Sequence, residues 1–251
     1  MRESSPCVSQ LAFVEEGLRI DDTACVEPAA VILRGKSPHV TQVEANVFVG
    51  ANATVLGGVR LGLGCRIEPG AVVHHDVPPH AIVAGNPAVL VGYVNSSSVL
   101  NDEAFVAPRP GEAVFELLKN GASLWSLPRV KDVRGSLSVS DFGGDGVPFT
   151  PLRCFFVYDV PSSEVRGQHA HYACHQFLVA VSGSVMAMVD DGKERKEVLL
   201  DHPSKGLYMP PLTWGVQYRY SRDAVLIVLA SHPYDPSDYI RDYQAFLAVP
   251  K

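Results

Sequence analysis

An aliphatic residue recurs every six positions through the first third of the chain. The positions are Val14, Ile20, Val26 and Ile32, then Val43, Val49, Val55, Leu61, Ile67 and Val73. Small or modest side chains stand four residues after many of them, at Ala24, Ala30, Ala53, Val59, Cys65 and Ala71. An α-helix with 3.6 residues per turn cannot keep a six-residue stripe on one face. The spacing therefore predicts a triangular solenoid with one short strand per side and the aliphatic residues inside.

The best-formed part of this repeat reads VFVGANATVLGGVRLGLGCRIEPGAVVHHDVPPHAIVAGNPA. It resembles the hexapeptide-repeat acyltransferases, which form left-handed β-helices, and most of all N-acetyltransferases that act on nucleotide-linked amino sugars. The final DVPPHAIVAGNPA resembles the last turn of that family. The interval between Ile32 and Val43 resembles the loop that interrupts the family's repeat. The resemblance implies a first domain at residues 1–95 that uses acetyl-CoA, with Gly85, Asn86 and Pro87 as candidate contacts.

Two interpretations of this domain stay open. The family has further turns before this point, which carry much of the acceptor pocket, and only about three turns are expected here. The domain is then either a truncated structural element that builds a trimer or an enzyme that still transfers acetyl groups. The four histidines of this region, His39, His74, His75 and His80, are interpreted as solvated side chains.

The six-residue period ends near Val94, and residues 96–121 are interpreted as a linker with a short helix at 114–120. From residue 122 to 251 the pattern changes to short runs rich in β-branched and aromatic residues, separated by turn sequences such as DDGK at 190–193. Many short strands at such spacing favour an antiparallel sandwich or jelly roll. The predicted class is all-β, a short β-helix followed by a jelly-roll barrel.

The segment RGQHAHYACHQFLVAVSGSV contains a pair of histidines with one residue between them, His169 and His171, and a third, His175, which is interpreted as a solvated side chain at the strand end. On a strand both imidazoles face the same side, so both are expected in one pocket. Imidazoles titrate near neutral pH and suit proton transfer. Metal-binding cupins complete a similar pair with a carboxylate and a later histidine, where this chain has Gln176 and Trp214, which are poor metal ligands. Acid–base chemistry is the preferred hypothesis, and a metal site or a purely structural pair are the alternatives.

The second half also resembles the sugar-nucleotide 3,4-ketoisomerases, which act on thymidine-diphosphate-linked 4-keto-6-deoxyglucose. The resemblance covers residues 124–247 and rests on DVRGSLSV, VPFTPLRCFFVYDVP, RGQHAHYACHQFLVAVSGSV, GLYMPPLTW and YDPSDYIRDYQAF. The family's catalytic pair falls on His169 and His171, and Tyr172 stands where the family usually has a basic residue. The family includes fusions in which a hexapeptide-repeat acetyltransferase precedes the isomerase, in the order seen here.

The resemblance implies conversion of a dTDP-4-keto-6-deoxyhexose to the 3-keto sugar by histidine-mediated proton transfer, without a cofactor. The product would serve the synthesis of 3-amino-3,6-dideoxy sugars for surface polysaccharide such as lipopolysaccharide. Candidate substrate contacts are Arg134, Arg153 and Arg166 for the diphosphate and Tyr158, Gln176, Tyr208 and Trp214 in the pocket. A bifunctional enzyme that also N-acetylates the amino sugar and a non-catalytic sugar-nucleotide-binding scaffold are the alternatives.

Composition narrows the possible partners. The formal net charge is −6 and no Lys/Arg run occurs, which argues against a nucleic-acid partner. No apolar run approaches the roughly 20 residues of a membrane span. Five scattered cysteines favour a reducing cytoplasm. A homo-oligomer is expected, with a dimer through the barrel, a trimer through the β-helix, or a hexamer that combines the two.

Overall fold

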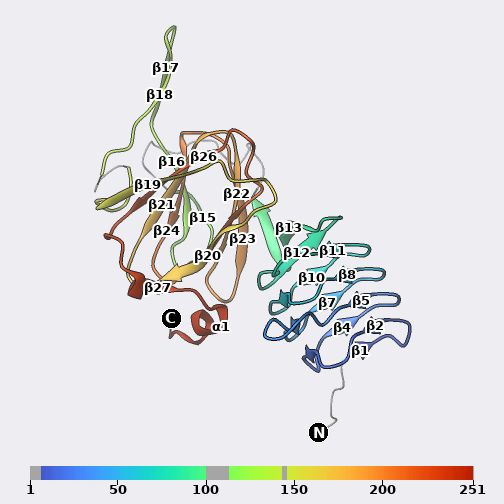
Figure 1. The fold of residues 1–251 in the computed structure, drawn as a ribbon. Coiled ribbons are helices and arrows are strands. Elements are labelled where there is room, and N and C mark those ends of the chain that lie inside the picture. The colour runs from blue at the N-terminus through green and yellow to red at the C-terminus, as the bar shows by residue number, and fades with distance from the viewer. Residues whose placement is uncertain (1–6, 100–112, 143–145, 251) are drawn as a thin grey trace. The chain divides into compact units, whose positions relative to one another are not determined.

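The computed structural model describes residues 7–99, 113–142 and 146–250. The chain divides into two compact units, Met1–Asn95 and Ser96–Lys251, and each is described by itself. Strands dominate both units (Figure 1), so the predicted all-β class is confirmed.

The first unit is a parallel β-helix built from two-residue strands. Their bounds are β1 (Cys7–Val8), β2 (Phe13–Val14), β3 (Arg19–Ile20), β4 (Cys25–Val26), β5 (Val31–Ile32), β6 (Gln42–Val43), β7 (Phe48–Val49), β8 (Thr54–Val55), β9 (Arg60–Leu61), β10 (Arg66–Ile67) and β11 (Val72–Val73). Each strand from β1 to β8 pairs in parallel with the strand three places further along, which gives three sheets. The described residues form three full coils and a partial fourth, slightly more than the three turns predicted. An antiparallel pair, β12 (Ala81–Ala84) and β13 (Val89–Tyr93), ends the unit.

The predicted periodic residues fill the inside of this β-helix. The aliphatic residues from Val26 to Val73 are at most 3% exposed, and the small residues that accompany them are equally buried. Val14 and Ile20, in the first described coil, are only half-buried. Residues 33–41 form the predicted interrupting loop, which Thr41 fixes by donating its hydroxyl to the Leu33 carbonyl at 2.6 Å and accepting the Gly58 N–H at 2.8 Å.

The second unit is a barrel of two six-stranded sheets. One sheet has the order β14 (Ser96–Val99), β23 (Arg195–Leu200), β22 (Val185–Asp190), β25 (Trp214–Tyr218), β20 (Arg166–His171) and β27 (Tyr239–Ile240). The other has the order β15 (Ala113–Glu116), β16 (Ser123–Ser126), β24 (Lys205–Met209), β21 (Gln176–Ser182), β26 (Val225–Ala230) and β19 (Arg153–Tyr158). A buried apolar core that includes Leu178, Val198, Leu207 and Leu226 lies in this unit. The turn predicted at 190–193 joins β22 to β23.

The interpretation of residues 96–121 as a linker needs correction. Ser96–Val99 forms β14 and Ala113–Glu116 forms β15, and both strands belong to the barrel sheets. The helix predicted at 114–120 is therefore wrong. The apolar residues of this seven-residue segment have helical spacing, but the segment pairs with β16 instead. In such a short segment, tertiary contacts outweigh the intrinsic helix propensity. Residues 100–112 lie outside the described ranges.

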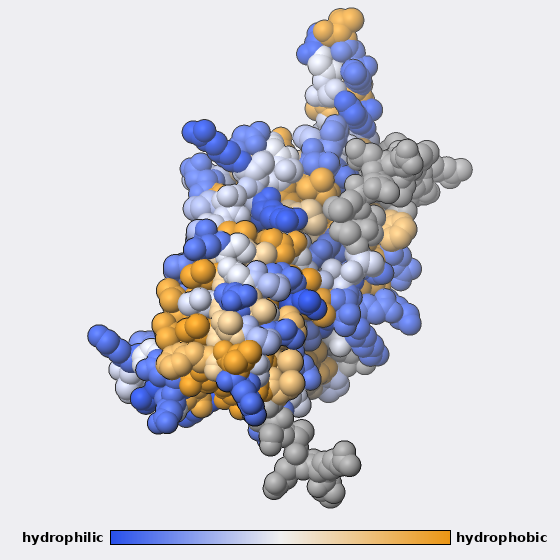
Figure 2. Space-filling view, turned by 90° about the vertical axis from the view of Figure 1, so that its right-hand side faces the viewer, coloured by the Kyte–Doolittle hydropathy of each residue, from blue (hydrophilic) through white to orange (hydrophobic). Residues whose placement is uncertain are grey.

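A hairpin of β17 (Arg129–Asp132) and β18 (Gly135–Ser138) projects from the barrel (Figure 1). It bears exposed apolar side chains, Val130, Val133 and Leu137. Figure 2 shows apolar residues at its tip. An isolated two-stranded hairpin is marginally stable in water, so this one depends on its attachment or on a partner. Within the described part of the chain, no helix is both long and apolar enough to cross a bilayer.

The segment after β26 runs back across the barrel as a 3-10 turn η2 (Pro236–Asp238), strand β27 and helix α1 (Tyr243–Ala248). Helix α1 starts at Asp242, whose carboxylate accepts the Ala245 N–H at 2.8 Å. The Tyr243 hydroxyl donates to the buried Asp190 carboxylate at 2.7 Å, and Arg195 Nε lies 2.6 Å from the same oxygen. These bonds attach the segment that brings β27 to the edge of β20.

Candidate active site

A cavity of about 160 Å³ lies in the barrel, lined by side chains from both sheets. Apolar residues form much of its wall, namely Phe155, Val157, Leu178, Met209 and Val228. The polar lining comes from Arg166, His169, Gln176, Gln217 and Tyr239. An apolar cavity with a few convergent polar groups is the usual form of a small-molecule site.

A β-bulge in β20 sets the position of His169. The register with β25 shifts between Gly167 and His169, and Gly167 and Gln168 have φ values of +83° and +55°. A Cβ on Gly167 would lie 2.6 Å from the Gly215 carbonyl oxygen, so only glycine fits here. The bulge lets the His169 ring fold back, and its Nδ1 lies 2.9 Å from the Gly167 carbonyl oxygen.

This contact fixes the tautomer of His169. A carbonyl oxygen only accepts hydrogen bonds, so Nδ1 carries the proton and Nε2 keeps its lone pair. Burial lowers the pKa of His169, the bond to Gly167 opposes that shift, and the positive charges of Arg241 and Arg153 lower the pKa further. His169 is therefore a neutral imidazole at the cavity wall with a free basic nitrogen.

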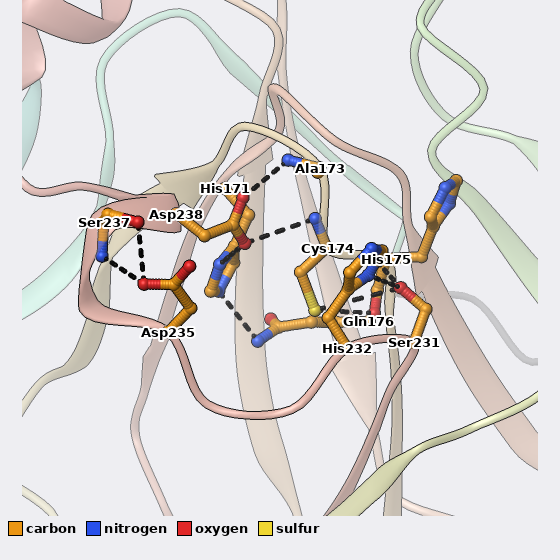
Figure 3. A network of polar contacts seen from close by, with 10 residues as sticks. All are labelled: His171, Ala173, Cys174, His175, Gln176, Ser231, His232, Asp235, Ser237 and Asp238. Carbon is orange, nitrogen blue, oxygen red and sulfur yellow. Dashed lines mark hydrogen bonds and ion pairs between the residues drawn. The ribbon is translucent and has the colours of Figure 1, made fainter.

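His171 lies beside His169 but in a different environment. The two ring centroids are 5.0 Å apart, yet His171 is 5% exposed and does not line the cavity. Its Nδ1 is 2.8 Å from Asp238 Oδ2, and its Nε2 is 3.1 Å from the Gln176 amide nitrogen (Figure 3). Burial, and next the proximity of His169, lower the pKa of His171 to about 4, although Asp238 acts in the opposite direction.

The carboxylate of Asp238 is itself held by the backbone. It accepts the Ala173 N–H at 2.7 Å and the Cys174 N–H at 3.3 Å (Figure 3). Tyr239, the next residue, places its ring 4.3 Å from the His171 ring and 4.9 Å from the His169 ring. The 3-10 turn η2 thus contributes an ion partner to the histidine pair, and strand β27 contributes an aromatic wall.

Positive charge surrounds the histidines. Arg166 lines the cavity, and the Arg241 guanidinium lies 4.3 Å from the Tyr239 ring centroid. The Arg153 guanidinium lies 5.2 Å and 5.6 Å from the ring centroids of Phe155 and Tyr234, and its buried Nε has no hydrogen-bond partner among the described residues. A buried donor without a partner is costly. The arrangement therefore favours an anionic ligand.

The structure brings only some of the predicted site residues together. His169, Arg166 and Gln176 line the cavity, and Arg153 and His171 lie next to them. Tyr158 points away from the core on β19 and is exposed. Tyr208 bonds to His175 at 2.7 Å and lies outside the cavity lining.

The side chains of Trp214 and Arg134 also lie outside the cavity lining. Side chains alternate along β25, and because Gly215 lines the cavity, Trp214 packs against Tyr243 and Phe246 instead. Arg134 sits on the projecting hairpin, where it pairs with Asp132 at 2.6 Å. The structure does not bring these two side chains to the cavity of this chain.

Sequence reasoning missed Asp238, Tyr239 and Arg241. All three stand in YDPSDYIRDYQAF, which was singled out as a motif without a role for any residue. Local pattern could not reveal the pairing of Asp238 with His171, because 67 residues separate them. The acidic residue Asp238 within this motif was the one sequence signal that could have pointed to a partner for a histidine.

Three potential metal ligands, from His171, Cys174 and Asp238, lie within 4.8 Å of one another. They fit a metal poorly. The Asp238 carboxylate already accepts two backbone N–H groups and the His171 proton, and a cation would have to displace that proton. The donor set is better described as a hydrogen-bonded carboxylate–imidazole pair.

Comparison with known proteins places the barrel unit in a family. Residues 120–251 match the family model FdtA, described as WxcM-like, C-terminal. The TDP-4-oxo-6-deoxy-alpha-D-glucose-3,4-oxoisomerase of Aneurinibacillus thermoaerophilus is 41% identical over 118 residues, which are 47% of this chain and 84% of that protein. The chain belongs to the WxcM-like family.

A solved structure supports the same relation. The sugar 3,4-ketoisomerase QdtA from Thermoanaerobacterium thermosaccharolyticum, in complex with TDP, is 34% identical with a TM-score of 0.50. The match covers 52% of this chain and 94% of that one.

The first unit has relatives of another kind. Residues 41–75 match the bacterial transferase hexapeptide model. A 2,3,4,5-tetrahydropyridine-2,6-dicarboxylate N-acetyltransferase from Enterococcus faecalis is 46% identical over 69 residues. These are 28% of this chain and 30% of that protein, so the chain spans less than a third of this relative.

Proposed function

We propose that the barrel is a sugar-nucleotide 3,4-ketoisomerase that converts a dTDP-4-keto-6-deoxyhexose to the 3-keto sugar. The observation that carries the proposal is His169, a neutral imidazole with a free Nε2 at the wall of the cavity. The related oxoisomerase and the TDP-bound ketoisomerase support the substrate class. The positive groups Arg153, Arg166 and Arg241 suit the diphosphate.

The reaction is an internal proton transfer. The 4-keto group acidifies the hydrogen on carbon 3, and His169 removes it through Nε2. The C3–H electron pair forms the C3=C4 bond, and the C4=O π electrons move to the oxygen, which becomes an enolate oxygen. A proton passes from the oxygen on carbon 3 to the oxygen on carbon 4. The histidine returns its proton to carbon 4, which leaves the ketone at carbon 3, so no oxidant or reductant enters the balance.

The side chains around His169 support this chemistry. A neutral base near pH 7 can take up the carbon-bound proton, and the lowered pKa keeps His169 neutral there. Gln176 and Tyr239 line the same cavity and offer polar groups to the sugar oxygens. The apolar wall excludes water, which strengthens those contacts.

Incubation of the full chain with TDP-4-keto-6-deoxyglucose in D₂O tests the proposal. We expect deuterium at carbon 3 of recovered substrate and a 3-keto product, both visible by NMR. His169→Asn should lose both signals, and the exposed His74→Asn on the first unit should keep them. A folded wild-type chain that binds TDP without exchanging the carbon 3 hydrogen would contradict the isomerase proposal and favour a binding scaffold.

A second candidate function belongs to the β-helix. Its hexapeptide repeat and its N-acetyltransferase relatives support acetyl transfer from acetyl-CoA. A TDP-3-amino sugar is the acceptor that fits the proposed product of the barrel. Gly85, Asn86 and Pro87 form the turn between β12 and β13, where the Gly85 carbonyl accepts the Val72 N–H at 2.9 Å. Thiol release from acetyl-CoA in the presence of the amino sugar would support this activity. Its absence would favour the structural interpretation of the unit.

The proposal extends to assembly and location. Exposed apolar residues on the barrel, among them Phe156, Val133 and Leu152, support a homo-oligomer. Sedimentation analysis distinguishes a barrel dimer, a β-helix trimer and a hexamer. The five cysteines are all unpaired, which supports the cytoplasmic location. The proposed 3-keto product would there serve the synthesis of surface polysaccharide.

A further inference from the structure

A pair of thiols lies on the outer face of the β-helix. Cys7 of β1 and Cys25 of β4 stand directly opposite each other in the parallel register of these two strands (Figure 1). The Cys7 N–H donates to the Ala24 carbonyl at 3.0 Å and the Ser9 N–H donates to the Val26 carbonyl at 2.9 Å, so backbone bonds fix the register. Val26 is buried inside the β-helix, and side chains alternate along a strand, so both cysteines face outward.

The spacing of the two strands suits a disulfide. Neighbouring strands lie about 4.8 Å apart, and the Cα atoms of linked cysteines are usually roughly 4.4 to 6.8 Å apart. The Cys7 thiol is within hydrogen-bonding reach of the Cys25 sulfur. The Cβ atoms of such a pair keep about the strand spacing, slightly more than the roughly 3.5 to 4.5 Å of a disulfide. A small shift of β1 closes this difference, and β1 is the edge strand of its sheet in the described part of the chain.

The other three cysteines lack this combination of partner and access. Cys65 and Cys174 are buried. Cys154 is exposed, but its partner across the sheet on β26 is a leucine. Cys7 is exposed and Cys25 is half-buried, so a small reagent can reach their thiols. Among the described residues, the site for a disulfide is therefore specific to this pair.

We propose that Cys7 and Cys25 are a reversible oxidation site, at which a small disulfide such as oxidised glutathione links the two thiols and so holds the first described coil of the β-helix closed. The site goes beyond both proposed activities and depends on neither. In a reducing compartment the pair stays as two thiols, the form present in this structure. An exposed and slightly strained disulfide is easily reduced again, which makes the link reversible.

The oxidation is two thiol–disulfide exchanges. The Cys7 thiolate attacks one sulfur of oxidised glutathione, whose S–S bond breaks, and one glutathione leaves as its thiolate. The Cys25 thiolate then attacks Cys7 Sγ and displaces the second glutathione. The two cysteines lose two electrons and two protons, and one glutathione disulfide becomes two glutathione thiols. Partial burial, and next the adjacent Cys7 thiol, raise the pKa of Cys25, which leaves the first attack to the exposed Cys7.

The link would act on the part of the β-helix that is packed least. Val14 and Ile20 of the first described coil are only half-buried, whereas the corresponding residues of the next coils are buried. The end of a repeat array opens more readily than its middle, because it has a neighbour on one side only. A disulfide between β1 and β4 spans this whole coil and removes conformational freedom from its open state. Oxidation should therefore protect this coil and leave the barrel unchanged.

Peptide mapping of the oxidised full chain tests the link. The folded protein is incubated with oxidised glutathione, its remaining thiols are blocked, and it is then unfolded and digested with trypsin. Cleavage at Arg19 separates the two cysteines, so we expect peptide 3–19 joined to peptide 20–34, and a reductant should release both. Glutathione that stays on Cys7 without forming this joined peptide would overturn the proposal, as would a bond between the Cys7 residues of two chains.

Two serine variants provide the controls. Cys25→Ser removes the second thiol, so glutathione should remain on Cys7 and the joined peptide should be absent. Cys154→Ser removes an exposed thiol that has no cysteine opposite it, so the joined peptide should form as in the wild type. Far-UV circular dichroism checks that both variants are folded. Loss of the joined peptide in Cys154→Ser would overturn the pairing of Cys7 with Cys25.

Amide hydrogen exchange of the full chain tests the effect on the coil. In the oxidised wild type, the amides of residues 7–26 should exchange at least about 10-fold more slowly than in the reduced protein. The amides of the barrel strands should change by less than about 2-fold, because the link lies in the other unit. Cys25→Ser should show no slowing after the same treatment. Equal exchange of residues 7–26 in the reduced and the linked wild type would overturn the proposal.

Discussion

The interiors of the two units differ in what their side chains can do. Inside the β-helix, one aliphatic side chain per strand repeats coil after coil, and the fully buried positions from Val26 to Val73 carry no charge. Inside the barrel, an apolar core shares the interior with imidazoles, amides and guanidinium groups around a cavity. The β-helix interior can supply only stability, whereas the barrel interior also holds groups that move protons. Four predictions test this contrast.

The largest effect is expected at the cavity. Among the described residues, His169 is the only imidazole that lines it, so His169→Asn should lower isomerisation by about 10²- to 10⁴-fold, the usual contribution of a general base. Product formation followed by NMR measures this loss. The melting temperature should change little, since the half-buried side chain leaves its apolar surroundings intact. Residual activity within tenfold of wild type would show that another group is the base.

A substitution inside the β-helix should lower stability and leave isomerisation unchanged. Ile67 is fully buried, so Ile67→Ala should destabilise the first unit by about 2–5 kcal/mol. Denaturant unfolding measures this, with Arg66→Ala on the exposed side of the same strand as control. The kcat for isomerisation of the folded protein should stay near wild type. A large fall in kcat would show that the barrel depends on the β-helix interior.

The third prediction concerns pH and the buried His171. Its pKa in the folded state is about 4, below the 6.5 of the unfolded chain. Between these values the unfolded state binds more protons, so the stability of the barrel should fall as pH drops from about 6.5 toward 4. The loss from this residue should be at most about 3 kcal/mol. His171→Asn should flatten the slope of unfolding free energy against pH, and an unchanged slope would contradict this assignment.

The smallest effect on isomerisation is expected for a residue of β19 that lies outside the cavity lining. Tyr158 points away from the core, so Tyr158→Phe should change kcat and KM for isomerisation by less than about 2-fold. Phe155 lines the cavity three residues earlier on the same strand, and Phe155→Leu should raise KM measurably. A larger effect of Tyr158→Phe would indicate that this face meets the substrate through a second copy of the chain.

The repeat in the first unit could be predicted almost residue by residue, because a period of six leaves only one arrangement that buries Val49, Val55 and Leu61 together. In the barrel, both histidines were expected in one pocket; their rings lie 5.0 Å apart, but only His169 is among the described residues that line the cavity. Trp214 was expected in the pocket, but its neighbour Gly215 lines the cavity instead. On a strand, a shift of one residue exchanges the side chains that face the cavity with those that face away from it. The bulge at Gly167 and the pairing of Asp238 with His171 arise from contacts between distant strands, which no local pattern contains.

The attachment of β27 beside β20 also bears on how the protein folds. Asp238 and Tyr239 reach His171 across sequence separations of 67 and 68 residues, and the chain between them includes strands β21 to β26, half of the strands in the two barrel sheets. Contacts of such high sequence separation form slowly, because the loop between them must close first. Isomerase activity should therefore return late in refolding, after most of the far-UV circular dichroism of the strands has recovered. The rate at which activity returns then measures the last step of barrel assembly.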